Sequence, residues 1–379
     1  MLQAEALEKL QSLKRVLVVS KRTRWEFASA RYGGIGGQAL ERLMRAKGFP
    51  YERIVQAHHS HHDALDQITR ALRRRGTDVR MVRAPALIAS DLENIDAVFA
   101  CGGDGTVLET AARVKSSELP VVTVNTDPKL STGYLCSFAL QSGISFERGV
   151  LDKLCRGQFS PQLRSRIQVE FGNTGELSPH LALNEIFFAE RDASRPTVHA
   201  TTLPSINPTE PVVQRSSGVI VSTGTGSTAW MHSAMTVHRS DVQRVLECLH
   251  KEQGPAAPEN FAKNEKIVEA ISRSLNQLHE FDPADTRLHY YMRELVLNGW
   301  YGDHDSPLTQ FPKHGFESHL SLRSLSWDGM LTFDGIEQSP VPYGEELKIS
   351  LAPPEYSLLT IRLHPNEDEE TNDPALDLD

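Results

Sequence analysis

The chain has 379 residues, with 40 Lys and Arg against 49 Asp and Glu, which gives a formal net charge of -9. This length is sufficient for two packed domains. The acidic balance argues against a nucleic-acid partner and against binding to an anionic membrane, because both need concentrated Lys and Arg. The four cysteines are far apart and form no C-x-x-C pair, which is typical of a protein in a reducing compartment.

Residues 1–14 are predicted to form a short amphipathic helix, which includes Glu5 and Glu8. These acidic residues are not typical of a secretory signal or of an Arg-rich and Ser-rich transit peptide. The sequence therefore favours a cytoplasmic location. No apolar run reaches the ~20 residues that span a bilayer.

Residues 15–150 alternate between apolar strands and amphipathic helices. The predicted strands are residues 15–20, 78–82, 97–101 and 121–125. The predicted helices are residues 37–47, 63–75 and 106–115. This alternation predicts a doubly wound α/β domain.

The pattern changes after residue 150 to short strands separated by turns. The predicted strands are residues 166–171, 182–189, 218–222, 320–325, 331–333 and 347–351. We therefore expect a β-rich, sandwich-like domain over residues 151–362, with a helical insertion at about 237–295. Residues 363–379 are acidic with few apolar side chains, which predicts a disordered tail.

The segment Cys101-Gly-Gly-Asp-Gly-Thr106 lies between a predicted strand and a predicted helix. Its glycines let the backbone approach a phosphate, and the N-terminus of the following helix directs free N–H groups at the same point. A carboxylate there repels phosphate unless it has a task, such as accepting a proton or holding Mg²⁺. The alternative interpretation is that Asp104 only caps the helix.

This GGDGT segment resembles the superfamily that groups NAD kinases with diacylglycerol and sphingosine kinases. In that superfamily the loop grips phosphates and its Asp acts as the base. The resemblance therefore implies a kinase in which Asp104 is catalytic and Gly102, Gly103, Gly105 and Thr106 bind phosphate.

Two further motifs indicate the acceptor. Asn184-Glu185 is similar to the Asn-Glu/Asp pair of NAD kinases, which holds nucleotide hydroxyls and base edges. The run Gly218-Val-Ile-Val-Ser-Thr-Gly-Thr-Gly-Ser-Thr-Ala-Trp230 resembles the family's strand followed by T-P-T-G-S-T-A-Y. Without the resemblance, the Thr/Gly/Ser string could be an ordinary flexible turn.

The chain departs from the general family at several positions, and the departures resemble the mitochondrial-type branch. Gly224 stands in the place of Pro and Trp230 in the place of Tyr. Asn125-Thr-Asp-Pro128, Ser131-Thr-Gly-Tyr-Leu135 and Lys21-Arg-Thr-Arg-Trp-Glu26 also resemble this branch. The matrix of mitochondria is therefore the alternative location.

The resemblance implies that the enzyme transfers the γ-phosphate of ATP, held with Mg²⁺, to the adenosine-ribose 2′-hydroxyl of NAD, with NAD as substrate. It also implies a homodimer. The implied nucleotide-binding residues beyond the GGDGT loop are Asn125, Asn184, Glu185, Thr228, Ala229, Trp230 and Ser233. Arg22 follows the first strand and could contact phosphate, although a solvated surface Arg is an equally open interpretation.

Other interpretations remain. A lipid or sphingoid kinase could share the GGDGT loop, but it would need a basic or amphipathic surface that this acidic chain does not show. A non-catalytic dinucleotide-binding regulatory protein could retain the fold. His58-His-Ser-His-His62 is interpreted as a solvated helix entry, and no metal ligand is assigned there.

Overall fold

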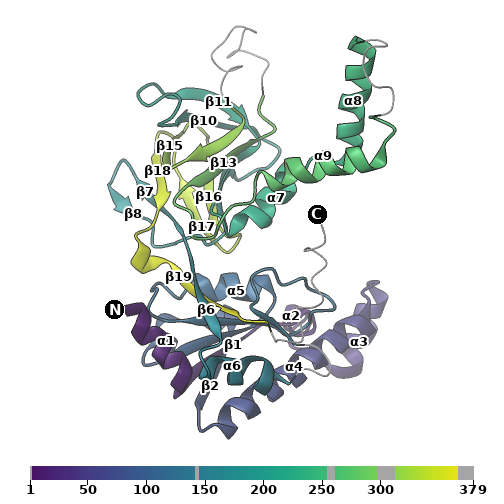
Figure 1. Cartoon of the computed structure of the whole chain (residues 1–379), viewed down its shortest axis with the longest axis vertical. Coiled ribbons are helices and arrows are strands. Elements are labelled where there is room, and N and C mark those ends of the chain that lie inside the picture. Colours follow the sequence, from purple (N-terminus) through teal and green to yellow (C-terminus); the bar gives the residue numbers. More distant parts are fainter. Residues whose placement is uncertain (1, 141–144, 254–260, 297–311, 366–379) are drawn as a thin grey trace. The chain divides into compact units, whose positions relative to one another are not determined.

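The computed structural model describes residues 2–140, 145–253, 261–296 and 312–365 (Figure 1). The chain divides into two compact units. The first comprises Met1–Leu163 and Pro354–Asp379, and the second comprises Arg164–Pro353.

The first unit is an α/β structure. Its strands are β1 (Arg15–Ser20), β2 (Asp78–Arg83), β3 (Ala97–Gly102), β4 (Val121–Asn125), β5 (Phe138–Ala139), β6 (Phe159–Arg164) and β19 (Leu358–Leu363). Its helices are α1 (Leu2–Ser12), α2 (Arg24–Arg31), α3 (Gly37–Ala46), α4 (Tyr51–Arg74), α5 (Asp104–Ala111) and α6 (Asp152–Cys155). Shorter helical turns are η1 (Ala84–Ala86), η2 (Ala89–Leu92) and the π-helical η3 (Glu147–Leu151).

The sheet of this unit has the order β2-β1-β3-β4-β19-β6, and β5 also pairs with β4. The pairs β1–β2, β1–β3, β3–β4 and β4–β19 are parallel. Val16, Val18 and Phe99 face a core that also contains Leu10 of α1 and Ile68 of α4. The apolar runs are continuous because parallel strands of this kind are buried on both faces. The predicted α/β domain is confirmed.

The C-terminal strand β19 does not belong to the domain that the sequence predicted for it. Residues 151–362 were expected in the β-rich domain, but β19 lies in the first unit, where Thr360 pairs with Val121. Leu358 and Leu359 are fully buried there, so their apolar surface is removed from water by the parallel sheet. Of the predicted tail, Leu363 ends β19, and residues 366–379 lie outside the described residues.

The second unit is a β-sandwich with the predicted sandwich-like character. One sheet contains β11 (Val212–Ser216), β10 (Thr197–Thr202), β15 (His319–Ser324), β18 (Glu346–Leu351), β7 (Ile167–Phe171) and β8 (Glu176–Leu177), in this order. The other contains β14 (His314–Glu317), β13 (Leu288–Arg293), β12 (Gly218–Ser222), β9 (Glu185–Glu190), β16 (Gly329–Phe333) and β17 (Glu337–Val341). Alternate residues of both sheets, such as Leu288, Tyr290 and Leu322, form one core.

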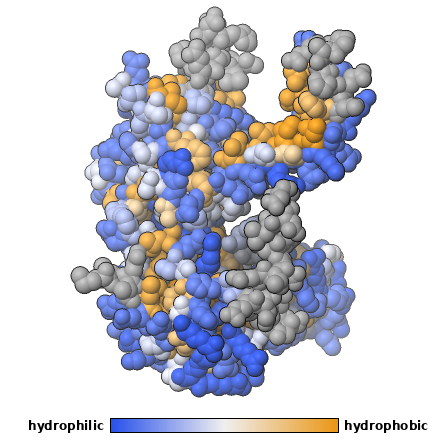
Figure 2. All heavy atoms as spheres, viewed as in Figure 1, coloured by the Kyte–Doolittle hydropathy of each residue, from blue (hydrophilic) through white to orange (hydrophobic). Residues whose placement is uncertain are grey.

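Of the residues that the structure describes between β12 and β13, three segments are helices. They are α7 (Trp230–Met235), α8 (Arg239–Gln253) and α9 (Glu265–Gln277), and a short turn η4 (Gly226–Thr228) precedes them. The predicted insertion at 237–295 extends too far, because residues 288–293 form β13. Apolar side chains gather on the surface of α8 and α9 (Figure 2), where Val245 and Leu278 are among the exposed residues.

Among the described residues, none of the helices combines the length and the apolar character needed to cross a membrane.

Candidate active site

The GGDGT loop lies at the point where the strand order of the first unit reverses. The chain passes from β1 outward to β2, and then returns to the other side of β1 to form β3. Ligands of open α/β sheets bind outside the carboxyl ends of the two strands that flank such a point. The loops after β1 and β3 meet here, where the Lys21 N–H donates to the Cys101 carbonyl at 3.1 Å.

Two glycines of the loop are required by close packing. A Cβ at Gly102 would lie 2.2 Å from Thr106 Oγ1, and a Cβ at Gly103 would lie 2.7 Å from Ser131 Oγ. Gly105 differs, because a Cβ there would meet nothing within 4 Å. Gly105 is exposed in the first turn of α5, so its backbone is open to a ligand at the helix N-terminus.

Asp104 is the first residue of α5, and Gly103 is the cap of this helix. The carboxylate of Asp104 makes no capping hydrogen bond. It accepts the N–H groups of Tyr134 at 3.2 Å and Leu135 at 2.8 Å. The capping interpretation is therefore wrong, and the bonds to residues 134 and 135 fix the orientation of the carboxylate at the edge of the loop.

Asn125 lies beneath the segment that holds Asp104. Its side chain is 1% exposed, its Nδ2 donates to the Ser131 carbonyl at 2.8 Å, and its Oδ1 accepts the Asp127 N–H at 3.0 Å. Gly133 packs on it with φ +67. The amide of Asn125 is therefore engaged in shaping the loop.

A cavity of about 660 Å³ opens beside the GGDGT loop, and Asp104, Gly105 and Thr106 line it. The cavity also brings in cationic residues from the loop after β1, from α2 and from α4, namely Lys21, Arg22, Arg24 and Arg53. Such a group of cations balances the charge of a polyphosphate. The structure thus places Arg22 beside the loop, and its guanidinium lies 5.0 Å from the ring centre of Phe27. Sequence reasoning missed Lys21 and Arg53.

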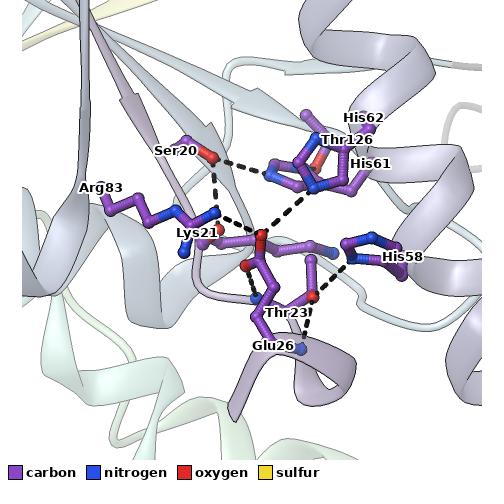
Figure 3. A network of polar contacts seen from close by, with 9 residues as sticks. All are labelled: Ser20, Lys21, Thr23, Glu26, His58, His61, His62, Arg83 and Thr126. Carbon is purple, nitrogen blue, oxygen red and sulfur yellow. Dashed lines mark hydrogen bonds and ion pairs between the residues drawn. The ribbon is translucent and has the colours of Figure 1, made fainter. Parts of the chain in front are cut away.

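The loop that carries Lys21 is held by a network of polar contacts (Figure 3). His61 of α4 is fully buried, with Nε2 2.9 Å from Ser20 Oγ and Nδ1 2.9 Å from Thr126 Oγ1. Burial, and then the charge of Lys21, lower the pKa of His61 to about 3. This neutral ring joins the carboxyl ends of β1 and β4.

The interpretation of residues 58–62 as a solvated helix entry is wrong. Helix α4 begins at Tyr51, and the histidines lie within it. His58 Nδ1 is 2.9 Å from Thr23 Oγ1, and Thr23 forms a reciprocal capping box with Glu26 at the start of α2. The polar histidines obscured the helical periodicity because they face the network rather than an apolar core.

In the second unit, Asn184 and Glu185 are held by a residue that the sequence did not indicate. Both oxygens of the Asp334 carboxylate accept N–H groups, from Leu183 at 2.6 Å, Asn184 at 2.8 Å and Glu185 at 3.1 Å. Asp334 has φ +51 in an Asp-Gly turn, and its own N–H donates to the Glu185 carbonyl at 3.0 Å. The Asp-Gly pair predicts a turn, but not a contact with residues about 150 positions earlier.

The side chains of Asn184 and Glu185 are buried and yet retain free polar atoms. Asn184 Oδ1 and Glu185 Oε2 bond to none of the residues that the structure describes. Burial, and then the nearby Asp334, raise the pKa of Glu185 to about 8. Burial also raises the pKa of Asp334 to about 6, against the hydrogen bonds that it accepts and the charge of Arg166. Unpaired polar atoms in a buried position are typical of a ligand site.

The Thr-Gly-Thr-Gly-Ser segment packs directly on the Asn-Glu pair, so the flexible-turn interpretation is wrong. The Thr223 hydroxyl donates to the Leu183 carbonyl at 2.6 Å, and the Thr223 N–H donates to the Asn184 carbonyl at 2.9 Å. A Cβ at Gly226 would lie 2.2 Å from that same Asn184 oxygen. This segment and the pair therefore form one rigid group.

The remaining candidate residues follow this group and are accessible to solvent. Thr228, Trp230 and Ser233 are exposed, and Ala229 is half-buried. Trp230 makes an edge contact with Phe187 at 4.8 Å between ring centres, and the Arg293 guanidinium lies 5.4 Å from its ring. Part of the indole face thus remains available to a flat ligand.

Comparisons with known proteins found relatives in sequence and in structure. No family model matches the chain. NAD kinase 2, mitochondrial, of Xenopus tropicalis is 28% identical over 374 residues, covering 85% of this chain and 84% of that protein. NAD kinase 2, mitochondrial, of Homo sapiens is 29% identical over 360 residues, covering 85% of this chain and 78% of that protein.

Two solved structures show the same fold. An Archaeoglobus fulgidus NAD kinase in complex with ATP superimposes with a TM-score of 0.51 at 17% identity, covering 94% of this chain and 96% of that chain. Yeast NADH kinase complexed with NADH superimposes with a TM-score of 0.52 at 14% identity, covering 97% and 89%. The relatives in sequence and the motifs of the chain together make it similar to the NAD kinases, including those of the mitochondrial type.

Proposed function

We propose that this protein is an NAD kinase, which transfers the γ-phosphate of ATP to the adenosine-ribose 2′-hydroxyl of NAD and so forms NADP and ADP. The observation that carries this function is the pair of buried, unpartnered atoms Asn184 Oδ1 and Glu185 Oε2 beside the Thr-Gly-Ser segment. Both atoms are in a position to form hydrogen bonds with the hydroxyl groups of a nucleotide. The relatives named NAD kinase 2 support the same acceptor.

The loop of the first unit supplies the phosphate site. We assign the phosphate contacts to the N–H groups of Gly103 and Gly105 at the start of α5, since the Thr106 N–H already donates to the Gly103 carbonyl at 2.9 Å. Lys21 and Arg22 in the same cavity balance the negative charge. Burial lowers the pKa of Lys21, and its ion pair with Asp127 at 3.8 Å opposes this shift.

Asp104 is the proposed base. Its carboxylate accepts the proton of the 2′-hydroxyl while the oxygen forms a bond to the γ-phosphorus and the bond to the β-phosphate oxygen breaks. The backbone N–H groups of Tyr134 and Leu135 fix the orientation of this carboxylate, so a flexible charged side chain is not needed for that purpose. Phosphoryl transfer depends mainly on this kind of positioning.

Magnesium is the expected metal, since bound Mg²⁺ neutralises charge on ATP. The carboxylates of Asp104 and Asp127 line the cavity and are the hard oxygen ligands that this ion prefers. With Asp104 assigned as the base, Asp127 is a carboxylate of this cavity that can serve the nucleotide-bound ion.

Glu185 and Asn184 supply the proposed hydroxyl contacts. With its pKa at about 8, Glu185 is protonated at neutral pH, so its carboxyl can donate one hydrogen bond and accept another. Asn184 Oδ1 accepts from a second hydroxyl. Thr228, Ala229, Trp230 and Ser233 are proposed to contact the dinucleotide on the accessible surface that follows.

The location and the assembly are also proposals. The relatives are named mitochondrial, and this supports a mitochondrial rather than a cytoplasmic location. The homodimer rests on resemblance, and the exposed apolar side chains of α8 and α9 are surface that an assembly could bury. Light scattering on a size-exclusion column measures the assembly, and a mass of one chain at micromolar concentration would exclude a stable dimer.

The acceptor is tested by offering several acceptors to the purified protein with Mg²⁺ and ATP labelled in its γ-phosphate. We expect label in NADP or NADPH and none in sphingosine or diacylglycerol presented in micelles. Label in the lipid alone would establish the lipid-kinase alternative. Binding of NAD without any transfer, from ATP or from polyphosphate, would establish the regulatory alternative.

A further inference from the structure

The environment of His289 is unusual for a buried polar side chain. His289 lies on β13, on the face turned away from the sandwich core, and it is 0% exposed. Neither of its ring nitrogens bonds to any residue in the described part of the chain. Leaving a buried donor or acceptor unpaired costs about 1–3 kcal/mol, so the arrangement needs a reason.

Two other histidines point to that reason. His314 lies on β14 opposite Tyr291, and His289 lies opposite Phe316, so the two histidines share one face of the sheet. His279 comes from the segment that follows α9. One ring nitrogen from each of the three histidines lies within 4.8 Å of the others.

All three histidines lie in an environment that disfavours the charged ring. Burial, and then His279 and His314, lower the pKa of His289 to about 3. Burial also lowers the pKa values of His279 and His314. Three charged residues surround the cluster: Glu280 follows His279 and lies 3.7 Å from His232 Nδ1, Lys313 helps to lower the pKa of His314, and Arg287 lies over Phe316, which stacks on His289.

We propose that His279, His289 and His314 form a binding site for a divalent transition metal of the zinc class. Imidazole nitrogens are common ligands of such ions, and three of them with one water complete a tetrahedral shell. Bond lengths of about 2.0–2.1 Å place ligand nitrogens roughly 3.3 Å apart, and the soft χ2 torsion of histidine allows this closure.

A second group of possible metal ligands, in the first unit, differs from the three histidines in its hydrogen bonds. Glu26, His58 and His62 also lie close together, but these side chains are already satisfied. Glu26 accepts from the Thr23 N–H and from Arg83 at 2.8 Å, and His58 bonds Thr23 (Figure 3). A cation would have to replace these bonds, whereas His289 has none to lose among the described residues.

The proposed metal would fix a segment that borders the nucleotide-binding group. The Phe281 N–H donates to Ser227 Oγ at 3.4 Å, and the Asp282 carbonyl occupies the space beside Gly224. His289 itself pairs with Ser222 at the end of β12. A metal at His279 therefore holds residues 279–282 against this part of the sandwich.

The test is a titration of the full chain, with any purification tag removed and bound metal stripped by a chelator, against Co²⁺ followed by Zn²⁺. We expect one equivalent of Co²⁺ to give the intense visible absorption of a tetrahedral site, and Zn²⁺ to displace it. Loss of one ligand, in His289→Phe or in His314→Gln, should weaken the affinity roughly 100-fold or more. His319→Gln is the matched control, because His319 is an exposed strand histidine whose ring contacts Ser318.

Phe is chosen at position 289 because the His289 ring stacks on Phe316 and makes an edge contact with Phe281, so another aromatic ring can replace it. His314 is exposed on an edge strand, so its variant keeps the test valid even if His289→Phe fails to fold. In addition, Zn²⁺ should raise the melting temperature of the parent but not of the variants. A parent without a tetrahedral cobalt spectrum, or an affinity unchanged in both ligand variants, would overturn the proposal.

Discussion

At the scale of single residues, the two units place their candidate carboxylates in opposite environments. Asp104 is half-exposed and held by two N–H groups, whereas Glu185 is buried with one oxygen free among the described residues. An exposed carboxylate is suited to accept a proton. A buried, protonated one is suited to donate a hydrogen bond to a ligand.

The raised pKa of Glu185 makes a prediction about stability and pH. Because the folded pKa of about 8 exceeds the ordinary value of 4.5, the folded state binds more protons than the unfolded state between these values. Stability should therefore fall as the pH rises from about 5 to 8. Glu185→Gln removes this titration and should raise the melting temperature relative to the parent more at pH 8 than at pH 5.

Thermal unfolding of the ligand-free protein at the two pH values measures this effect, which is at most about 1.4 kcal/mol for each unit of pKa shift. Glu170→Gln is the control, because Glu170 forms a surface ion pair with Lys348. An equal change at both pH values would contradict the assigned protonation of Glu185.

Sequence reasoning reaches candidate residues where chemistry and local pattern coincide. Asp104 and the Asn184-Glu185 pair were proposed because their motifs are contiguous in the chain. Lys21 was quoted only as part of a longer resemblance, and Asp334 and Arg53 stand in no local motif, because each reaches its position through folding. Asp334 makes the point most clearly, since a turn residue supports a motif about 150 positions earlier.

At the scale of the elements, the glycines of the GGDGT loop have different surroundings. Gly102 is closely packed, whereas Gly105 has open space beside it. Gly102→Ala should destabilise the protein by about 1–3 kcal/mol, because the new Cβ would lie 2.2 Å from Thr106 Oγ1. Gly105→Ala should leave stability unchanged or raise it by up to about 1 kcal/mol, because it lies in a helix with open space around it.

Even so, Gly105→Ala should lower NADP formation by about tenfold or more, since its methyl group faces the space where a phosphate would approach. Chemical denaturation and steady-state kinetics of the two variants separate these effects. Full activity in Gly105→Ala would show that phosphate does not approach this backbone.

Gly224 explains one departure from the general family pattern. A Cβ at this position would lie 1.9 Å from the Asp282 carbonyl oxygen, so the segment before β13 occupies the space that a Pro would need. Gly224→Ala should therefore cost about 1–3 kcal/mol of stability. In Gly36→Ala, the matched control, the new Cβ would meet only Trp25 at 3.9 Å, and the cost should stay below about 1 kcal/mol. Equal stability of the two variants in urea would contradict this packing.

At the scale of the whole molecule, the alternation of strands and helices correctly predicted the α/β unit and the β-sandwich. The chain order did not predict that β19 returns to the first unit. A short strand after Pro353-Pro354 carries no signal that distinguishes the two sheets, since its burial in the parallel sheet is a tertiary event. For the same reason, β13 was assigned to the helical insertion.

The most direct test of the account is NADP formation by the parent, by Asp104→Asn and by Glu118→Gln, an exposed carboxylate of the same unit. The rate of a single turnover is measured by rapid quench with saturating ATP, Mg²⁺ and NAD, after circular dichroism has shown that each variant is folded. The account predicts a loss of about 10²- to 10⁴-fold in Asp104→Asn and a parent-like rate in Glu118→Gln. A folded Asp104→Asn protein that transfers phosphate at the parent rate would contradict the assignment of Asp104 as the base.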